Sequence, residues 1–368
     1  MSSAFFIIPP APVQTPESLR QAWEVPSRPL PVVVIGAGAI VSTAHLPAYQ
    51  RLRLPIAGLF DIRLEAATRV AERFGIATVY RTLTEACQSG ADGAVVFDVA
   101  VPGDQVLGVL RCLPEGSAVL IQKPMGEDLA MAREIHDMCR ERNLIAAMNF
   151  QLRFSPNMLA LRDLLSRGEL GAIVDIEVRL QVRQPWESWP FMRGLPRLEV
   201  LYHSIHYLDM IRLIAGEPHG VYCRAVGHPA LAEYSDQRSS IILDYGDRLR
   251  CSLTLNHTHV FGPKHRVSMF KVEGMTGAAL LSMGVNLDYP SGLPDTLEIA
   301  RDGEWNAVAL RGSWFTEAFE GPMSNLQRFV TGEDSALVSP VSDAIRTMAV
   351  VEACYASSAA GGTPIPEP

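Results

Sequence analysis

Residues 31–150 alternate short apolar runs with helix-length segments, and this pattern constrains the fold more than any other feature. The runs that indicate strands cover 31–35, 54–60, 93–97, 117–121 and 144–148. The segments that indicate helices cover 64–74, 105–112 and 129–141. Strands that alternate with helices form right-handed crossovers, which build a parallel sheet covered on both faces. We therefore predict an α/β domain with a doubly wound parallel sheet over 31–150.

After residue 150 the pattern changes to strand-like runs in succession. These runs cover 171–182, 220–226, 239–245, 249–257 and 266–272, and helices are predicted at 157–167, 198–214, 315–330 and 342–357. The sequence DYGD at 244–247 is typical of a hairpin, because Gly246 tolerates the positive φ of a tight turn. Neighbouring strands without crossover helices favour antiparallel pairing. We predict an α+β domain with a large, mainly antiparallel sheet over 151–368.

Composition excludes several classes of protein. The chain has 368 residues, 48% of them hydrophobic and 20% charged, which is typical of a globular protein of two or three domains. The net charge of −8 and the lack of a basic stripe argue against nucleic acid as a partner. No apolar run reaches the ~18 residues of a transmembrane helix, so we expect no membrane association. Six cysteines without a C-x-x-C pair indicate reduced thiols and a cytoplasmic protein. Residues 1–30 contain six prolines, and we expect an irregular N-terminal arm.

A glycine-rich loop follows the first predicted strand and opens a helix. Its residues are Gly36, Ala37, Gly38, Ala39 and Ile40. In a Rossmann fold the first glycine permits a tight turn, the second lets a pyrophosphate approach, and the helix N-terminus attracts the phosphates. Asp61, at the end of the second strand, would bind ribose hydroxyls and repel a 2′-phosphate, whereas Arg63 would accept one. The loop predicts NAD or NADP, with NAD slightly favoured; a glycine-rich loop of another α/β fold is the alternative.

Gln122, Lys123 and Pro124 come directly after the fourth predicted strand. Ligands of doubly wound sheets collect at the carboxyl ends of the strands, so this position places Lys123 beside a nicotinamide. A lysine there would hydrogen-bond a substrate oxygen and stabilise developing negative charge. An ordinary surface lysine is the alternative interpretation.

The helix predicted at 198–214 carries a polar stripe. Tyr202, His206 and Asp209 share helical spacing, and Glu199 lies one turn earlier. A histidine flanked by a phenol and two carboxylates can be tuned for proton transfer near neutral pH. The alternative is a polar face that is simply solvated or internally satisfied.

Two other groups of residues carry weaker signals. His257 and His259 share one face of a strand and His265 is near in sequence, but no further zinc ligands are evident, so we expect no metal. A proline-punctuated loop before the 198–214 helix carries Trp186, Trp189, Phe191 and Arg193. Aromatic rings with an arginine suit stacking on a sugar ring, and they suit a protein interface equally well.

Taken in order, these motifs resemble those of the glucose–fructose oxidoreductase / inositol dehydrogenase (Gfo/Idh/MocA) family over about residues 31–360. The run Asn149-x-x-x-Arg153-Phe154-x-Pro156 belongs to the same set. The resemblance implies a Rossmann domain that binds NAD or NADP and an open-faced α/β domain that closes the active site and forms homodimers or homotetramers. It implies that Lys123 contacts the substrate hydroxyl and the nicotinamide, and that His206 is the general acid/base.

The predicted site residues follow from the motifs and the resemblance together. Cofactor contacts are predicted at the glycine loop, Asp61, Arg63, Pro102, Gln122 and Lys123. Substrate contacts are predicted at Arg153, Trp189, Glu199, Tyr202 and His206, with Tyr202 also a candidate catalytic residue.

The chain departs from the family pattern at several positions. Gln122 stands where the family has a glutamate, and Tyr202 stands where it has an aspartate four residues before the histidine. Gly103 and Val106 stand where the family has an asparagine and a histidine in one loop. We expect an oxidoreductase that transfers hydride between a nicotinamide and a sugar, polyol or related hydroxyl or keto compound. Gln122 and Tyr202 leave open a non-catalytic or regulatory NAD(P)-binding protein. A third alternative is an NADPH-dependent carbonyl or imine reductase.

Overall fold

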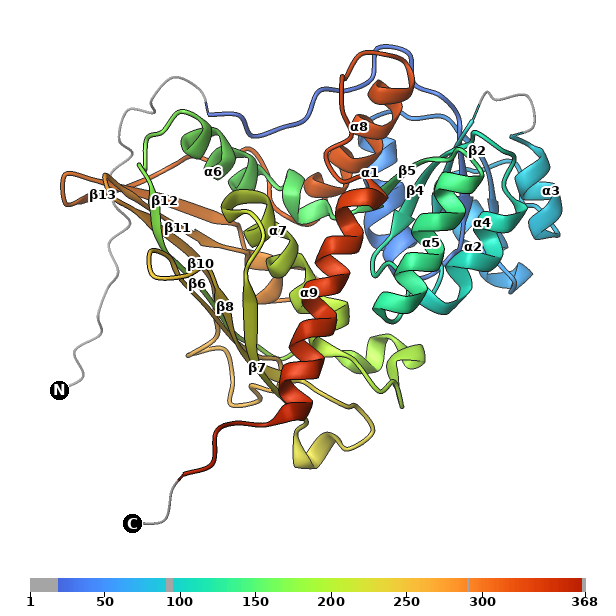
Figure 1. Cartoon of the computed structure of the whole chain (residues 1–368). Coiled ribbons are helices and arrows are strands. Elements are labelled where there is room, and N and C mark those ends of the chain that lie inside the picture. Colours follow the sequence, from blue (N-terminus) through green and yellow to red (C-terminus); the bar gives the residue numbers. More distant parts are fainter. Residues whose placement is uncertain (1–18, 91–94, 290, 366–368) are drawn as a thin grey trace.

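The computed structural model describes residues 19–90, 95–289 and 291–365 and contains two sheets with helices around them (Figure 1). One sheet has five strands and the other has eight. Residues 1–18 of the predicted N-terminal arm and residues 93–94 of one predicted strand lie outside the described residues. The predicted fold class, a Rossmann sheet followed by a large and mainly antiparallel sheet, is confirmed.

The five-stranded sheet is entirely parallel, with the order β2-β1-β3-β4-β5. Its strands are β1 (Val32–Ile35), β2 (Ile56–Phe60), β3 (Val96–Val99), β4 (Ala118–Gln122) and β5 (Ile145–Asn149). Its helices are α1 (Leu46–Arg51), α2 (Leu64–Phe74), α3 (Leu83–Gln88), α4 (Val106–Cys112) and α5 (Leu129–Glu141), and a π-turn at Val41–His45 precedes α1. Strand order reverses between β1 and β3, and ligands of such sheets bind at that point beyond the carboxyl ends.

The eight-stranded sheet has the order β13-β12-β11-β10-β6-β9-β8-β7. Its strands are β6 (Ile173–Gln181), β7 (Gly220–Val226), β8 (Arg238–Asp244), β9 (Arg250–Asn256), β10 (Val267–Gly274), β11 (Ala278–Ser282), β12 (Thr296–Arg301) and β13 (Glu304–Ala307). Neighbours run antiparallel except for β6 and β9, which are parallel. Buried and exposed residues alternate along β8, as expected of a sheet with one covered face.

Helices cover one face of this sheet. α6 (Pro156–Ser166), α7 (Ile205–Ala215) and α9 (Val341–Ala360) lie on the side that faces the Rossmann domain (Figure 1). The opposite face carries Tyr222 and Ile242, which are cross-strand partners and are 66% and 52% exposed. Within the described residues, no helix has both the length and the apolar character needed to cross a membrane.

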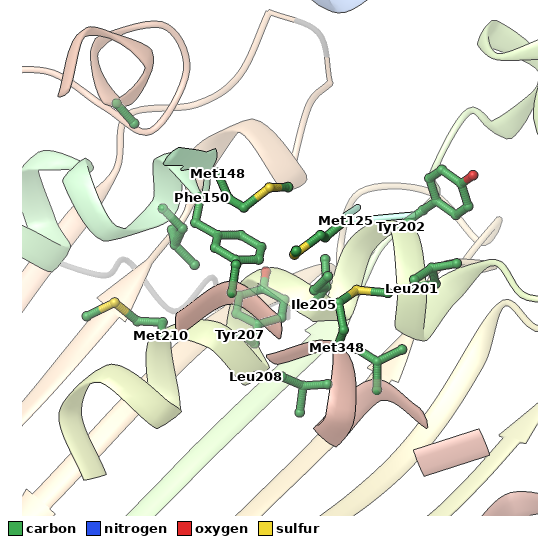
Figure 2. Packing of buried hydrophobic residues seen from close by; sticks show 14 of the residues in the cluster. Met125, Met148, Phe150, Leu201, Tyr202, Ile205, Tyr207, Leu208, Met210 and Met348 are labelled. Carbon is green, nitrogen blue, oxygen red and sulfur yellow. The ribbon is translucent and has the colours of Figure 1, made fainter. Parts of the chain in front are cut away.

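An apolar core is continuous between the two domains. Met125, Met148 and Phe150 come from the Rossmann side, and they pack in one cluster with residues of α7 and α9 (Figure 2). The α7 and α9 side chains shown there include Ile205, Tyr207, Leu208, Met210 and Met348. This core fixes the end of β4 relative to α7, so a residue at the end of β4 and one on α7 keep a defined geometry.

The last third of the chain also completes the Rossmann domain. Helix α8 (Glu320–Val330) packs on β4 and β5, and its Met323 and Leu326 lie fully buried in the core on that face of the parallel sheet. The backbone N–H of Met148 in β5 donates to the carbonyl of Ser339 at 2.8 Å. The sequence motifs thus divide between two domains at residue 150, but residues beyond that position still pack on the Rossmann sheet.

Candidate active site

The glycine loop has the backbone geometry that a dinucleotide site requires. Gly36 adopts φ +110°, and a Cβ there would lie 2.3 Å from the carbonyl oxygen of Ala100, so only glycine fits. A Cβ at Gly38 would meet no atom within 4 Å. The protein itself therefore does not require glycine at Gly38, whereas a pyrophosphate that approaches the backbone does. Ala39 is exposed at the start of the helix and Ile40 is partly exposed, so the loop fits the phosphates of NAD(P).

Asp61 ties the glycine loop to the end of β2. Its carboxylate accepts hydrogen bonds from the backbone N–H of Ala37 at 2.8 Å and of Arg63 at 2.9 Å. The Asp61 side chain is 11% exposed, while that of Arg63 is 71% exposed and its Nε lies 3.5 Å from Asp61. The carboxylate of Asp61 thus lies beside the glycine loop, and the exposed, cationic side chain of Arg63 lies next to that carboxylate. Pro102 is exposed three residues beyond the end of β3.

Lys123 connects the end of β4 to the helical segment that bears His206. Its Nζ donates a hydrogen bond to the carbonyl oxygen of Tyr202 at 2.6 Å. Burial of the ammonium group lowers the pKa of Lys123 to about 8. Tyr202 lies in a π-helical turn, Val200–Ser204, that precedes α7. Such turns break the regular helix ladder and are frequent at functional sites.

His206 lies in the first turn of α7 and is 4% exposed. Burial lowers its pKa well below 6.5, and the charges of Lys123 and His203 act in the same direction. Gln151 Nε2 lies 3.5 Å from His206 Nε2, and the ring of Trp314 packs edge-on at a centroid distance of 5.4 Å. Nδ1 of His206 has no hydrogen-bond partner among the described residues. The imidazole is therefore neutral near pH 7, and a neutral imidazole keeps one ring nitrogen with a lone pair that can accept a proton.

Gln122 is part of a buried polar network behind Lys123. Its Oε1 accepts the backbone N–H of Lys123 at 2.8 Å, and its Nε2 lies 3.3 Å from His45 Nε2. Asn149 Nδ2 lies 3.1 Å from the same nitrogen, and His45 Nδ1 lies 2.8 Å from the carboxylate of Asp98. These contacts assign the Nδ1–H tautomer to His45, with Nε2 as the acceptor. Gln122 thus positions the backbone of Lys123 and supplies no charge to it.

The two carboxylates predicted to flank His206 bond elsewhere. Glu199 is fully buried and accepts hydrogen bonds from the hydroxyls of Ser204 and Ser239 and from His257. Asp209 is paired with an arginine. A π-helical turn lies between Glu199 and His206 and contains more residues per turn than an α-helix. Spacing counted at 3.6 residues per turn therefore assigns Glu199 to the wrong face of the helix.

Arg153 is committed to a buried ion-pair network, not to the substrate contact that we predicted. It is 1% exposed, and its Nε and Nη2 lie 2.6 and 2.5 Å from the carboxylate oxygens of Asp209. Nη2 also lies 2.6 Å from Asp343, and Nη1 donates to the carbonyl of Val338 at 2.5 Å. These contacts link α7 to the first turn of α9 and to the segment before it. They correct the sequence-based prediction for Arg153.

The aromatic loop lies beside the helix of His206. The ring of Phe191 packs edge-on against Tyr202 at 5.9 Å, and Trp189 is partly exposed with its ring 5.5 Å from Tyr289. The hydroxyl of Tyr202 points away from the apolar cluster (Figure 2). Burial raises the pKa of Tyr202, and the carboxylates of Glu127 and Asp104 raise it further. Tyr202 therefore remains a neutral phenol with its polar end at the border of the core.

Sequence reasoning missed one group of residues at this site. One ligand-capable atom from each of Glu199, His203 and His257 lies within 4.8 Å of the others, and all three residues are buried. From the sequence, His257 pairs with His259 as a possible metal ligand, and Glu199 and His203 are not part of that pair. The distance in sequence between His257 and Glu199 left no local pattern by which to pair them.

Curated relatives cover part of the chain. D-glucoside 3-dehydrogenase of Escherichia coli is 28% identical over 199 residues, which are 52% of this chain and 56% of that protein. Trans-1,2-dihydrobenzene-1,2-diol dehydrogenase of Bos taurus is 31% identical over 140 residues, 38% of this chain and 42% of that protein. The matches thus span about half, or less, of the lengths of these relatives.

Solved structures share the fold over most of the chain. An oxidoreductase from Agrobacterium radiobacter, solved in complex with NAD+, L-tartaric acid and magnesium, superposes with a TM-score of 0.76 at 18% identity. That match covers 90% of this chain and 97% of the other. UDP-N-acetylglucosamine 3-dehydrogenase GnnA from Acidithiobacillus ferrooxidans gives a TM-score of 0.71 at 18% identity, covering 90% and 98%.

Two family descriptions match consecutive parts of the chain. Residues 30–150 match the oxidoreductase family with an NAD-binding Rossmann fold, GFO_IDH_MocA. Residues 158–279 match a GFO/IDH/MocA C-terminal domain. Together the matches cover about two thirds of the chain, in the order that the two sheets follow. The chain belongs to the Gfo/Idh/MocA oxidoreductase family, with an NAD(P)-binding Rossmann fold.

Proposed function

We propose that this protein is an NAD(P)-dependent dehydrogenase that oxidises a ring hydroxyl of a sugar or related polyol, or reduces the corresponding ketone. The observation that carries the proposal is the approach of Lys123 to the start of α7, where its Nζ bonds to Tyr202 and its charge acts on His206. Two relatives support the substrate class, because their names describe 3-dehydrogenases of a glucoside and of a nucleotide sugar.

The two side chains divide the proton chemistry between them. Neutral His206 accepts the proton of the substrate hydroxyl during oxidation, since its low pKa keeps a nitrogen lone pair available. Protonated Lys123 donates a hydrogen bond to the same oxygen and stabilises the negative charge that develops on it. NAD(P)+ supplies the hydride acceptor for the C–H bond that breaks. In the reverse direction His206 returns the proton and Lys123 polarises the carbonyl.

The neighbouring residues hold this pair and the substrate in place. Gln122 fixes the backbone of Lys123. Tyr202 presents a neutral hydroxyl beside the aromatic loop, where Trp189 offers a partly exposed ring for contact with a sugar face. Asp61 beside the glycine loop favours NAD over NADP, because a 2′-phosphate would meet its negative charge.

The decisive experiment compares Lys123→Met with Lys264→Met, a surface control. We expect Lys123→Met to lose about 10²–10³-fold in kcat, the usual effect of removing one donor to a developing oxyanion. Its affinity for NADH, measured by calorimetry beside NADPH, should stay near that of the unaltered protein. Lys264 is exposed, so its replacement should change neither quantity. Near-normal turnover by Lys123→Met on any sugar or polyol that the unaltered protein oxidises would refute the role of Lys123.

A second function is favoured by Gln122, since among the described residues no carboxylate side chain is hydrogen-bonded to Lys123. Under this alternative the chain binds NAD(P) as a regulatory protein and does not turn over substrate. Tight cofactor binding without redox change across a panel of sugars, polyols and keto compounds would support it.

We further propose that the protein is cytoplasmic and forms a homodimer or homotetramer through the open face of the eight-stranded sheet. Tyr222 and Ile242 support this, because paired apolar side chains exposed on a sheet face favour association. Light scattering on the purified protein measures the mass; a monomer at micromolar concentration would contradict the proposal.

A further inference from the structure

Three buried side chains meet between the start of α7 and the end of β9. Glu199 precedes the π-helical turn, His203 lies within it, and His257 directly follows β9. They are 0%, 9% and 1% exposed, respectively. One ligand atom of each lies within 4.8 Å of the other two. Two imidazoles and one carboxylate are a ligand set that divalent transition metals prefer.

The distances within the cluster suit a metal centre. His257 Nε2 lies 3.2 Å from Glu199 Oε1. Two ligands at about 2.0 Å from a tetrahedral zinc ion are roughly 3.3 Å apart, so these two atoms already have the spacing of coordinated neighbours. The rings of His203 and His257 are 4.3 Å apart at an interplanar angle of 67°, so the second imidazole reaches the same space without stacking on the first.

Among the described residues, the hydrogen-bond partners of Glu199 include no lysine or arginine. Glu199 is fully buried, yet its hydrogen-bond partners are the uncharged hydroxyls of Ser204 and Ser239 and the imidazole of His257. A buried carboxylate without a cationic partner is costly. A divalent cation bound between Glu199 and the two imidazoles would supply that partner.

The groups around the cluster hold its members in position. Ser239 donates to Glu199 Oε2 at 2.6 Å, while Oε1 accepts a hydrogen bond from the Ser204 hydroxyl and lies 3.2 Å from His257 Nε2. Nδ1 of His203 has no hydrogen-bond partner among the described residues. The ring of His203 packs against that of Tyr207 at a centroid distance of 5.8 Å, and the amide nitrogen of Asn286 donates to the hydroxyl of Tyr207 at 3.0 Å. Outer hydrogen bonds of this kind orient metal ligands.

We propose that Glu199, His203 and His257 form a binding site for a divalent transition-metal ion of the zinc class. Three protein ligands leave a fourth position for water or a substrate oxygen, as in catalytic rather than structural zinc sites. The site borders the proposed catalytic pair, since the charge of Lys123 acts on His203. The binding claim is independent of the proposed function, because it requires neither NAD(P) nor turnover.

The experiment uses the full chain, freed of metal with a chelator and titrated with ZnCl2, CoCl2 and MgCl2. We expect one equivalent of Zn2+ to bind with a dissociation constant in the micromolar range or below. Co2+ should give the visible absorption bands of a four- or five-coordinate nitrogen–oxygen site, and Mg2+ should not compete. Glu199→Gln and His257→Gln should each weaken Zn2+ binding at least 100-fold.

His259→Gln is the matched control, because His259 lies two residues from His257 and bonds to Gln181 instead. It should bind Zn2+ as the unaltered protein does. Circular dichroism and NADH binding check that the variants fold; should a variant not fold, the cobalt spectrum of the unaltered protein remains the test. No saturable Zn2+ binding by the unaltered protein, or equal binding by folded Glu199→Gln and His257→Gln, would overturn the proposal.

Discussion

Lys123 shows how burial changes the chemistry of one side chain. In water a lysine is almost fully protonated up to about pH 10. Burial of the Lys123 ammonium lowers its pKa to about 8, because the charged form loses solvation. His206 changes in the same sense, and its pKa falls well below 6.5. Near neutral pH the lysine is therefore charged and the histidine neutral, the combination on which the proposed hydroxyl oxidation depends.

The pKa of Lys123 predicts the basic limb of the pH profile. Under the proposed function, oxidation of a hydroxyl uses neutral His206 and protonated Lys123, so kcat/KM for oxidation should fall about tenfold per pH unit above pH 8. Lys123→Arg keeps its charge to above pH 12, so its slower reaction should lack that limb. Stopped-flow measurement of NAD(P)H formation from pH 6 to 10 checks this. A wild-type profile that stays flat to pH 10 would contradict the shift.

For single residues, the sequence indicates which positions are candidate site residues better than it indicates which side chains they contact. Lys123 and His206 could be proposed as site residues because each follows from a local pattern, a strand end and a helical stripe. The partners of Arg153 and Glu199 could not be proposed in this way, since Asp209 lies 56 residues from Arg153 and His257 lies 58 residues from Glu199. Such pairs are created by the tertiary fold, and no local spacing encodes them.

At the scale of elements, the helix that carries His206 is held at its start by Asp236. This carboxylate accepts the backbone N–H groups of Leu198 at 2.8 Å and of Glu199 at 3.1 Å, and the hydroxyl of Tyr355 at 3.1 Å. Asp236 lies in the connection between β7 and β8. The side chain of Asp236, from a loop distant in sequence, thus caps the start of this helix, as a local capping residue does in other helices.

We expect Asp236→Ala to destabilise the fold by about 1–2 kcal/mol, the usual effect of losing a cap. It should also lower kcat/KM by roughly 10- to 100-fold, because a shifted helix misplaces His206. Thr82→Ala, which removes the capping box of α3, is the control. It should cost similar stability in urea unfolding and leave kcat/KM unchanged. Equal kinetic effects of the two changes would refute a positioning role for Asp236.

Elements with strong local signals were predicted well. Predicted helices at 64–74 and 129–141 agree with α2 and α5, and α5 begins after Asp128, whose side chain accepts the N–H of Met131. Strands β11, β12 and β13 were not predicted. They are short and form one end of the sheet, where β11 pairs with β10, β12 with β11 and β13 with β12. The π-helical turn before α7 was missed because helical periodicity does not reveal it.

At the scale of the whole molecule, the two domains share their packing and should unfold together. Helix α8 from the second half covers the parallel sheet, and one apolar core runs between the domains. Tryptophan fluorescence reports on residues outside 31–150, where all five tryptophans lie: Trp23, Trp186, Trp189, Trp305 and Trp314. Fluorescence of bound NADH reports on the Rossmann domain. In one urea titration both signals should change with the same midpoint.

Met323→Ala tests this coupling. Met323 is fully buried against the parallel sheet, so its truncation should cost about 2–5 kcal/mol and shift both midpoints by the same amount. Leu293→Ala is the control, since Leu293 is 51% exposed and its loss should shift neither. Two separate transitions, or a shift of the NADH signal alone, would show that the domains unfold independently.

The position of α8 also sets the order of events on the ribosome. The parallel sheet is completed by residues 320–330, so its strands emerge long before the helix that covers one of their faces. At 5–20 residues per second, the delay between residues 150 and 330 is on the order of 10–40 s. For that interval the nascent chain carries an uncovered apolar surface on β4 and β5. We therefore expect the first half of the chain to benefit from protection against aggregation until α8 has been translated.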